Sequence, residues 1–306
     1  MKANLFTFGC SYTHFVWPTW SSCLSPYFDR IDNYARSGAG NLFIFTCFSN
    51  AIADDRIKKG DTVIIQWSSF VREDRIMQNE ETYSLGGYAF NNGFYSKKLL
   101  SRYFNTLQKG LELIGFITSI EAICEQKGIN LKMFHMFEPW IGISAGEPSF
   151  VHAELLHFGS KKLKEYRVLE KIKKLSSSPL FFPNSLEMLN DKEKYGVGYI
   201  KDKDTGKAFE DHHPQSIVHL HYCIKYIHPW LSSLSSTRKV DNIDSLTNNI
   251  KEWTEFMRDK NKVESLEVHG SILHTKYKSL IIPSKSFNTD YTEPQIPFKF
   301  TNIDLI

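Results

Sequence analysis

The feature that most constrains the fold is the segment at residues 61–67, which reads Asp-Thr-Val-Ile-Ile-Gln-Trp and holds four consecutive β-branched residues at 62–65. A continuous β-branched run of this kind is typical of a strand covered on both faces in a parallel sheet. Strands and helices are predicted to alternate around it, with strands at 4–8, 30–35 and 130–137 and helices at 15–28, 41–54, 98–126 and 217–231. This alternation predicts a doubly wound parallel sheet of the α/β class.

Composition excludes several classes of protein. Among 306 residues, 42% are hydrophobic and 23% are charged, which is the balance of an ordinary globular chain. The formal net charge of +3 is too small for a protein built to bind phosphate, and no cluster of Lys and Arg with interleaved aromatics stands out. We therefore expect no nucleic-acid partner.

The cysteines and the apolar segments indicate the cellular compartment of the protein. Its five cysteines include no Cys-x-x-Cys pair, which favours reduced thiols. No stretch approaches eighteen consecutive apolar residues, and the N-terminus shows no charged segment followed by an apolar one. We expect a cytoplasmic protein with no membrane partner, and assembly into a virus particle stays open.

The domain organisation is predicted to be one core with two attachments. Residues 1–235 form the core, and residues 138–209 form an insertion that covers the site, because prolines break the pattern there. The segment 71–95 is expected to be a loop excursion or a hairpin. Residues 236–306 form a C-terminal extension with no derivable role, in which we predict a polar helix at 243–257 and strands at 266–269 and 279–283.

A serine turn follows directly on the first predicted strand. That strand ends in Gly9-Cys10-Ser11, which places a hydroxyl at the edge of the sheet where open α/β folds carry their chemistry. About two hundred residues later, Asp211-His212-His213-Pro214 precedes a predicted helix. A serine hydroxyl becomes a useful nucleophile when a histidine accepts its proton and a carboxylate orients that histidine. Ser11, His213 and Asp211 are therefore the candidate catalytic residues.

These short blocks resemble the SGNH, or GDSL-like, hydrolases, which remove acyl groups from sugars, lipids and other esters. The resemblance implies a flavodoxin-like three-layer α/β/α sandwich with a parallel sheet. It also implies that Ser11 is the nucleophile and an oxyanion donor through its own N–H, with His213 as base and Asp211 as its partner. The family's second block, a glycine whose N–H faces the oxyanion, matches Gly38, with Gly40 as the fallback.

The third block departs from the family pattern. The family has Gly-x-Asn-Asp after the third strand, whereas this chain has Trp67-Ser68-Ser69-Phe70. Ser69 or Asn41 could supply the missing side-chain donor, and loss of one donor typically slows an enzyme by ~10²–10³. The run Gly-Cys-Ser-Tyr-Thr followed by Trp-Pro-Thr-Trp is similar to a phage-associated subset of the family, which implies a phage or bacterial source.

Several other residues of the sequence are candidates for a site. Cys10 is predicted to pack inward, because neighbouring strand residues point to opposite faces. The histidines at 212, 213, 219, 221 and 228 lack metal-ligand spacing, so neither a metal nor another cofactor is predicted. Arg72 could orient a polar or anionic substrate group or simply belong to a solvated turn.

The aromatic residues offer a further possibility, a sugar-stacking platform. Candidates for it are Tyr12, Trp17, Trp20, Trp67 and Trp140, although most are expected to be core residues. Tyr12, Trp67 and Arg72 complete the predicted substrate site.

Two functions compete. The first is a serine esterase that releases an acetyl or other short acyl group from a carbohydrate through an acyl-serine, with acyl transfer to a sugar hydroxyl also open. The second is a catalytically weak or inactive module of the same fold, a carbohydrate-binding or structural component associated with phage. The missing third-block asparagine and the unexplained C-terminal extension motivate the second.

Overall fold

A computed structural model describes residues 4–15, 17–69, 72–76, 83–88, 103–136, 166–185, 188, 196–201, 205–211, 213–240, 243–265 and 287–288. A parallel sheet with strand order β6-β3-β1-β2-β9 lies at its centre. The strands are β1 (Asn4–Phe8), β2 (Arg30–Asn33), β3 (Thr62–Trp67), β6 (Asn130–His135) and the two-residue β9 (Phe287–Asn288). The predicted parallel α/β sheet is confirmed.

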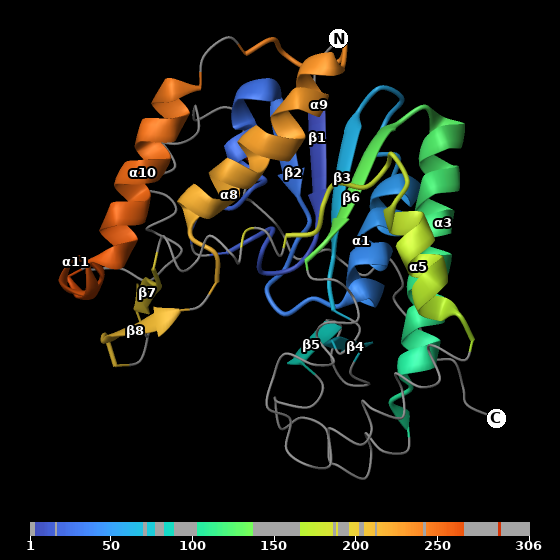
Figure 1. Ribbon diagram of the computed structural model, residues 1–306, viewed down its shortest axis with the longest axis horizontal. Helices are drawn as coiled ribbons and strands as arrows, with labels where there is room; N and C mark the ends of the chain where they lie inside the picture. The colour runs from blue at the N-terminus through green and yellow to red at the C-terminus, as the bar shows by residue number, and fades with distance from the viewer. Residues whose placement is uncertain are drawn as a thin grey trace.

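Helices cover both faces of this sheet, as Figure 1 shows. One face packs against α1 (Asn41–Ala53), α3 (Thr106–Lys127) and α5 (Val168–Ser176). The opposite face packs against the 3-10 helix η1 (Ser22–Tyr27) and against α8 (Ser216–Tyr222), α9 (His228–Ser233) and α10 (Asp244–Arg258). Side chains alternate between the two cores: Leu5 belongs to one, and Phe6 and Phe8 belong to the other.

Local capping sets the bounds of α3. The side chain of Asn105 accepts a hydrogen bond from the N–H of Gln108 at 3.2 Å, so the helix begins at Thr106 rather than at the predicted residue 98. Gly128 ends the helix in the left-handed conformation, at φ 66°.

Two predicted helices differ from the structure. The helix expected at 15–28 is limited to the short η1, and Pro18 precedes it. The helix expected at 217–231 is found as α8 and α9 joined by a π-helical segment, Cys223–Ile227. Gln215 is the N-cap of α8, so Pro214 lies just before the helix.

The segment predicted as an insertion contains part of the core. Within it, α5 buries Val168 and Ile172 in the same core as α3, so α5 covers the sheet and not the site. The antiparallel hairpin of β7 (Gly198–Lys201) and β8 (Ala208–Asp211) was not predicted. A second hairpin, β4 (Arg72–Ile76) and β5 (Tyr83–Tyr88), confirms one of the two options for residues 71–95.

The C-terminal extension also contributes to the core. Its predicted polar helix is found as α10, whose apolar side packs on the α8 side of the sheet, and α11 (Lys260–Glu264) follows it. The strands predicted at 266–269 and 279–283 lie outside the described residues. The sequence left the role of this extension open, and the structure gives part of it a place in the core, because Leu246, Ile250 and Trp253 are buried there.

Candidate active site

The serine turn is held tightly at the carboxyl end of β1. The Cys10 carbonyl accepts the N–H groups of Thr13 and His14 at 2.9 and 3.0 Å, which closes the turn around Ser11. The Thr13 hydroxyl donates to Gln66 Oε1 on β3 at 2.6 Å. Asn33, at the end of β2, donates its side-chain N–H to the Thr13 carbonyl at 3.0 Å. Both strands beside β1 therefore hold the turn in place.

The candidate base, His213, and its partner, Asp211, lie about two hundred residues after Ser11 in the chain. β8 ends at Asp211, whose Oδ1 accepts the backbone N–H of His213 at 2.8 Å and lies 2.8 Å from His213 Nδ1. The other ring nitrogen, Nε2, lies 2.9 Å from Ser11 Oγ. The structure thus brings together the three residues that sequence reasoning selected.

This geometry defines the proton positions that acyl transfer requires. When Nδ1–H donates to Asp211, Nε2 carries the lone pair and can accept the Ser11 proton. The Ser11 side chain is buried, with the residue only 2% exposed, so little water competes for its hydroxyl.

Two aromatic rings enclose the imidazole. The Phe15 ring stacks on that of His213 with centroids 4.0 Å apart and an interplanar angle of 27°. The Tyr12 ring meets it edge-on at 5.5 Å. Phe15 was missed by sequence reasoning, and its place four residues after Ser11, within the turn region, is the signal that could have found it. Tyr12 is 7% exposed and stays a candidate for the substrate site.

A second histidine lies behind Tyr12. His219 on α8 is 1% exposed, and its ring meets the Tyr12 ring edge-on at 6.4 Å. Burial, reinforced by the nearby His213, lowers the pKa of His219 to about 3, so its ring stays neutral at neutral pH. Among the described residues no group of three or more His, Cys, Asp or Glu side chains could hold a metal ion, and His212 lies outside those residues.

Cys10 points away from this cluster. Its thiol is fully buried and lies 3.3 Å from the sulfur of Met136, in the core on the α1 face. It therefore packs inward, as predicted, and is not placed to act as a nucleophile.

Two backbone N–H groups, those of Ser11 and Gly38, are the candidate oxyanion donors. Gly38 has φ 83° in a turn closed by the bond from Ala39 N–H to the Arg36 carbonyl at 3.1 Å. A bond from Arg36 N–H to the Gly9 carbonyl at 3.3 Å joins this turn to the serine turn. Within the described part of the chain, the N–H groups of Ser11 and Gly38 have no acceptor.

Two other predicted donors are occupied. The Gly40 N–H donates to Asp74 Oδ1 at 2.7 Å, so the fallback assignment was wrong. The amide of Asn41 donates to the Ser68 carbonyl at 3.2 Å and accepts the Ser68 N–H at 2.8 Å. Asn41 therefore ties α1 to the end of β3 with one of its two side-chain N–H groups, and its assignment as a replacement donor stays a prediction. Ser69 is buried beside this tie, and its role as a donor stays a prediction.

The predicted substrate residues on β3 and β4 belong to the protein interior. Trp67 is fully buried, and its indole N–H donates to the sulfur of Met133 at 3.4 Å. Arg72 is 8% exposed and donates to the Ala39 carbonyl at 3.2 Å. These bonds, to a core methionine and to the backbone after Gly38, correct both assignments to a substrate site. Trp17 and Trp20 are core residues too, and Trp140 lies outside the described residues.

The C-terminal helices support the loop that carries the base. Arg258 on α10 donates to the Gln215 side chain at 2.9 Å, and that side chain donates to the Gly196 carbonyl at 3.1 Å. The Glu264 carboxylate on α11 accepts the Ala208 N–H at 3.0 Å at the start of β8. α10 and α11 thus brace the strand that ends at Asp211, a role that sequence reasoning missed because it depends on contacts between distant segments.

Comparison of the chain with protein-family models, with curated proteins and with solved structures gave no match. In the part of the chain that the structure describes, no helix is both long enough and apolar enough to cross a membrane.

Proposed function

We propose that this protein is a serine hydrolase that cleaves an ester through Ser11, His213 and Asp211. The observation that carries the proposal is the pair of short contacts on one imidazole, 2.9 Å from Nε2 to Ser11 Oγ and 2.8 Å from Nδ1 to Asp211 Oδ1. A base hydrogen-bonded both to a hydroxyl and to an orienting carboxylate is the arrangement that activates a serine for acyl transfer.

The reaction proceeds in two halves. Ser11 Oγ attacks the ester carbonyl carbon while His213 Nε2 takes its proton, and Asp211 stabilises the imidazolium that forms. The N–H groups of Ser11 and Gly38 donate to the oxyanion of the tetrahedral intermediate. Collapse of this intermediate breaks the bond to the alcohol, which leaves with the proton from His213. Water, deprotonated by His213, then attacks the acyl-serine and releases the acid.

The family and the substrate form the finer part of the proposal. The order β2-β1-β3-β6 agrees with a flavodoxin-like sheet, and the blocks at Ser11, Gly38 and Asp211-His213 agree with an SGNH-like hydrolase. We infer a short acyl group, acetyl first, on a carbohydrate. Transfer of the acyl group to a sugar hydroxyl would use the same site, with that hydroxyl in place of water.

One observation favours a second function. Gly40 and Asn41, two of the predicted oxyanion donors, are bonded to Asp74 and to the Ser68 backbone. A site with fewer donors turns over slowly, and a protein that retains only binding would be a carbohydrate-binding or structural module with this fold.

Hydrolysis of p-nitrophenyl acetate separates these functions. Ser11→Ala and His213→Ala are each expected to lower kcat/KM by at least ~10³, since the three residues act as one unit. Ser25→Ala is the matched control, because Ser25 is a buried serine in η1 whose hydroxyl has no partner among the described residues. Equal rates in the wild type and all three variants would rule out the hydrolase and leave the binding module.

A further inference from the structure

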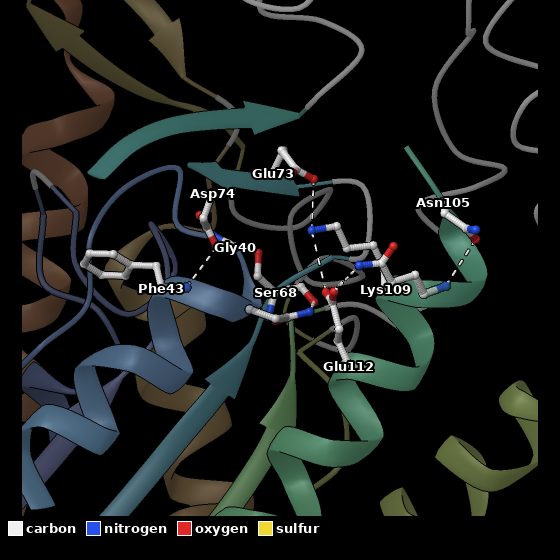
Figure 2. Close-up of polar contacts among 10 residues, drawn as sticks. Gly40, Phe43, Ser68, Glu73, Asp74, Asn105, Lys109 and Glu112 are labelled. Atoms are coloured by element: carbon white, nitrogen blue, oxygen red, sulfur yellow. Dashed lines mark hydrogen bonds and ion pairs between the residues drawn. The ribbon is translucent and has the colours of Figure 1, made fainter. Parts of the chain in front are cut away.

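Three consecutive residues of β4 join the hairpin to the start of α1 and to α3. Arg72 donates to the Ala39 carbonyl at 3.2 Å, and Glu73 pairs with Lys109 on α3 at 2.9 Å. Asp74 accepts the N–H groups of Gly40 and Phe43, at 2.7 and 2.9 Å (Figure 2). The β4–β5 hairpin lies beyond the carboxyl end of the sheet, below the first turn of α1 (Figure 1).

Asp74 takes the place of a helix cap. The N-cap of α1 is Gly40, which has no side chain to accept the unpaired N–H groups of the first turn. The Asp74 carboxylate accepts two of them, and its negative charge lies at the positive end of the helix dipole. The residue is only 4% exposed, so these bonds are shielded from water. Burial raises the pKa of Asp74, while the two N–H bonds oppose that shift.

The same hairpin holds both ends of one peptide group. The Ala39 carbonyl and the Gly40 N–H belong to the peptide that joins these residues, and Arg72 binds the first while Asp74 binds the second. This peptide lies two peptide groups after the one that carries the Gly38 N–H. Its plane determines the ψ angle of Ala39, and through the closed turn at Arg36 it constrains the direction of the Gly38 N–H.

We propose that Asp74 is a positioning residue that aims the Gly38 N–H at the oxyanion, an inference that rests on the proposed hydrolase function. Asp74 touches neither the substrate nor the reacting atoms. It acts through the Ala39–Gly40 peptide, and it gives this chain a fixed second-block donor where the third-block asparagine is missing.

The test measures oxyanion stabilisation separately from stability. Asp74→Asn keeps the size of the side chain, but its single amide oxygen can accept only one of the two N–H groups. Its NH2 group, which is a donor, would then face the other N–H. Glu73→Gln is the control, since the Glu73 carboxylate pairs with Lys109 and not with the Gly38 turn. Each protein is assayed on an aryl acetate and on the matching thionoester, whose sulfur is a weak hydrogen-bond acceptor.

We expect Asp74→Asn to lower kcat for the acetate by about 10- to 100-fold, less than complete loss of a donor. The thionoester rate should change little, so the ratio of ester to thionoester rates falls by a similar factor. Glu73→Gln should keep the wild-type ratio. Hydrogen exchange of a peptide spanning residues 38–46 should be faster in Asp74→Asn alone.

Each other outcome overturns the proposal. A lower melting temperature of Asp74→Asn with an unchanged rate ratio would show that Asp74 only caps α1. If the ratio of ester to thionoester rates falls while hydrogen exchange of the 38–46 peptide is unchanged, Asp74 does not act through the Ala39–Gly40 peptide. If the wild type shows no turnover that depends on Ser11, the proposed function fails, and the positioning role fails with it. If turnover depends on Ser11 but Asp74→Asn leaves the ratio of ester to thionoester rates unchanged, only the positioning role fails.

Discussion

The indole N–H of Trp17 donates to the backbone carbonyl of Pro214 at 2.8 Å, across 197 residues of chain. Trp17 lies six residues after Ser11, and Pro214 is the neighbour of His213. The bond is buried, with Trp17 1% exposed. It therefore ties the segment that supplies the hydroxyl to the loop that supplies the base, and it helps to maintain the 2.9 Å contact between them.

Trp17→Phe should weaken both stability and activity. Loss of the buried bond is expected to cost about 0.5–1.5 kcal/mol in the free energy of unfolding, and kcat should fall because the base is less well placed. Trp253→Phe is the control, since it removes the same volume from a buried position on α10. Melting temperature and kcat are measured for both variants. An equal loss of kcat in both would contradict a specific role for the Trp17–Pro214 bond.

Gly9→Ala should disrupt the serine turn. A Cβ at residue 9 would lie 2.0 Å from Thr13 Oγ1 and 3.2 Å from Gln66 Cβ, so the bond between these side chains cannot survive unchanged. We expect a fall in melting temperature together with a large loss of esterase activity. At Gly115, on α3, a Cβ meets nothing within 4 Å, and Gly115→Ala should raise stability by up to about 1 kcal/mol. Wild-type activity in Gly9→Ala would contradict this account of the turn.

Removal of the Phe15 ring should lower turnover. Its face lies against His213, so Phe15→Ala leaves the imidazole free to tilt, and misplacement of a catalytic group by about 1 Å can cost ~10² in rate. Phe15→Tyr keeps the ring and should retain most of kcat. Steady-state kinetics on an aryl acetate distinguish the two variants. If Phe15→Ala turns over as fast as the wild type, the ring does not orient the base.

Acid should destabilise the fold before the carboxylates titrate. Burial lowers the pKa of His135 and His219 to about 3 and that of His228 to about 4, against 6.5 for an unburied ring. The unfolded chain therefore binds more protons below pH 6.5, so the contribution of these groups is complete above that pH and is lost as the pH falls toward 4 and 3.

The expected slope is about 1.4 kcal/mol per pH unit for each of these histidines below pH 6.5. Urea unfolding at pH 7.5, 6 and 5 measures it. His135→Gln keeps a polar partner for Ser176, whose hydroxyl lies 2.8 Å from His135 Nε2. Because it removes one titrating group, it should reduce the slope by about 1.4 kcal/mol per pH unit. Stability that stays constant or rises between pH 7.5 and 5 would contradict the neutral, buried state of these rings.

Local patterns predicted the sheet and the candidate catalytic residues. The β-branched run of β3 and the alternation of strand and helix patterns are visible in the sequence itself. The Ser11 and Asp211-His213 blocks are short enough to recognise as motifs. The supporting residues could not be found in this way. Asp74 acts on Gly40 across 34 residues, and Arg258 acts on Gln215 across 43, so their partners depend on the folded arrangement.

Trp67 and Arg72 illustrate the opposite error. Trp67 ends β3 and Arg72 begins β4, both at the candidate active-site edge of the sheet. This position in the sequence is why both were predicted to contact the substrate. Which way each side chain points depends on what packs against it. Trp67 lies among Met133 and Phe116, and Arg72 reaches back to Ala39, so both became part of the support for the site.

Covalent labelling by a fluorophosphonate, located by mass spectrometry of the digested protein, tests the central claim most directly. We predict a single phosphonylated residue at Ser11 in the wild type, and almost no labelling in His213→Ala, since the hydroxyl then lacks its base. Labelling at another residue, or equal labelling of Ser11 with and without His213, would contradict the account.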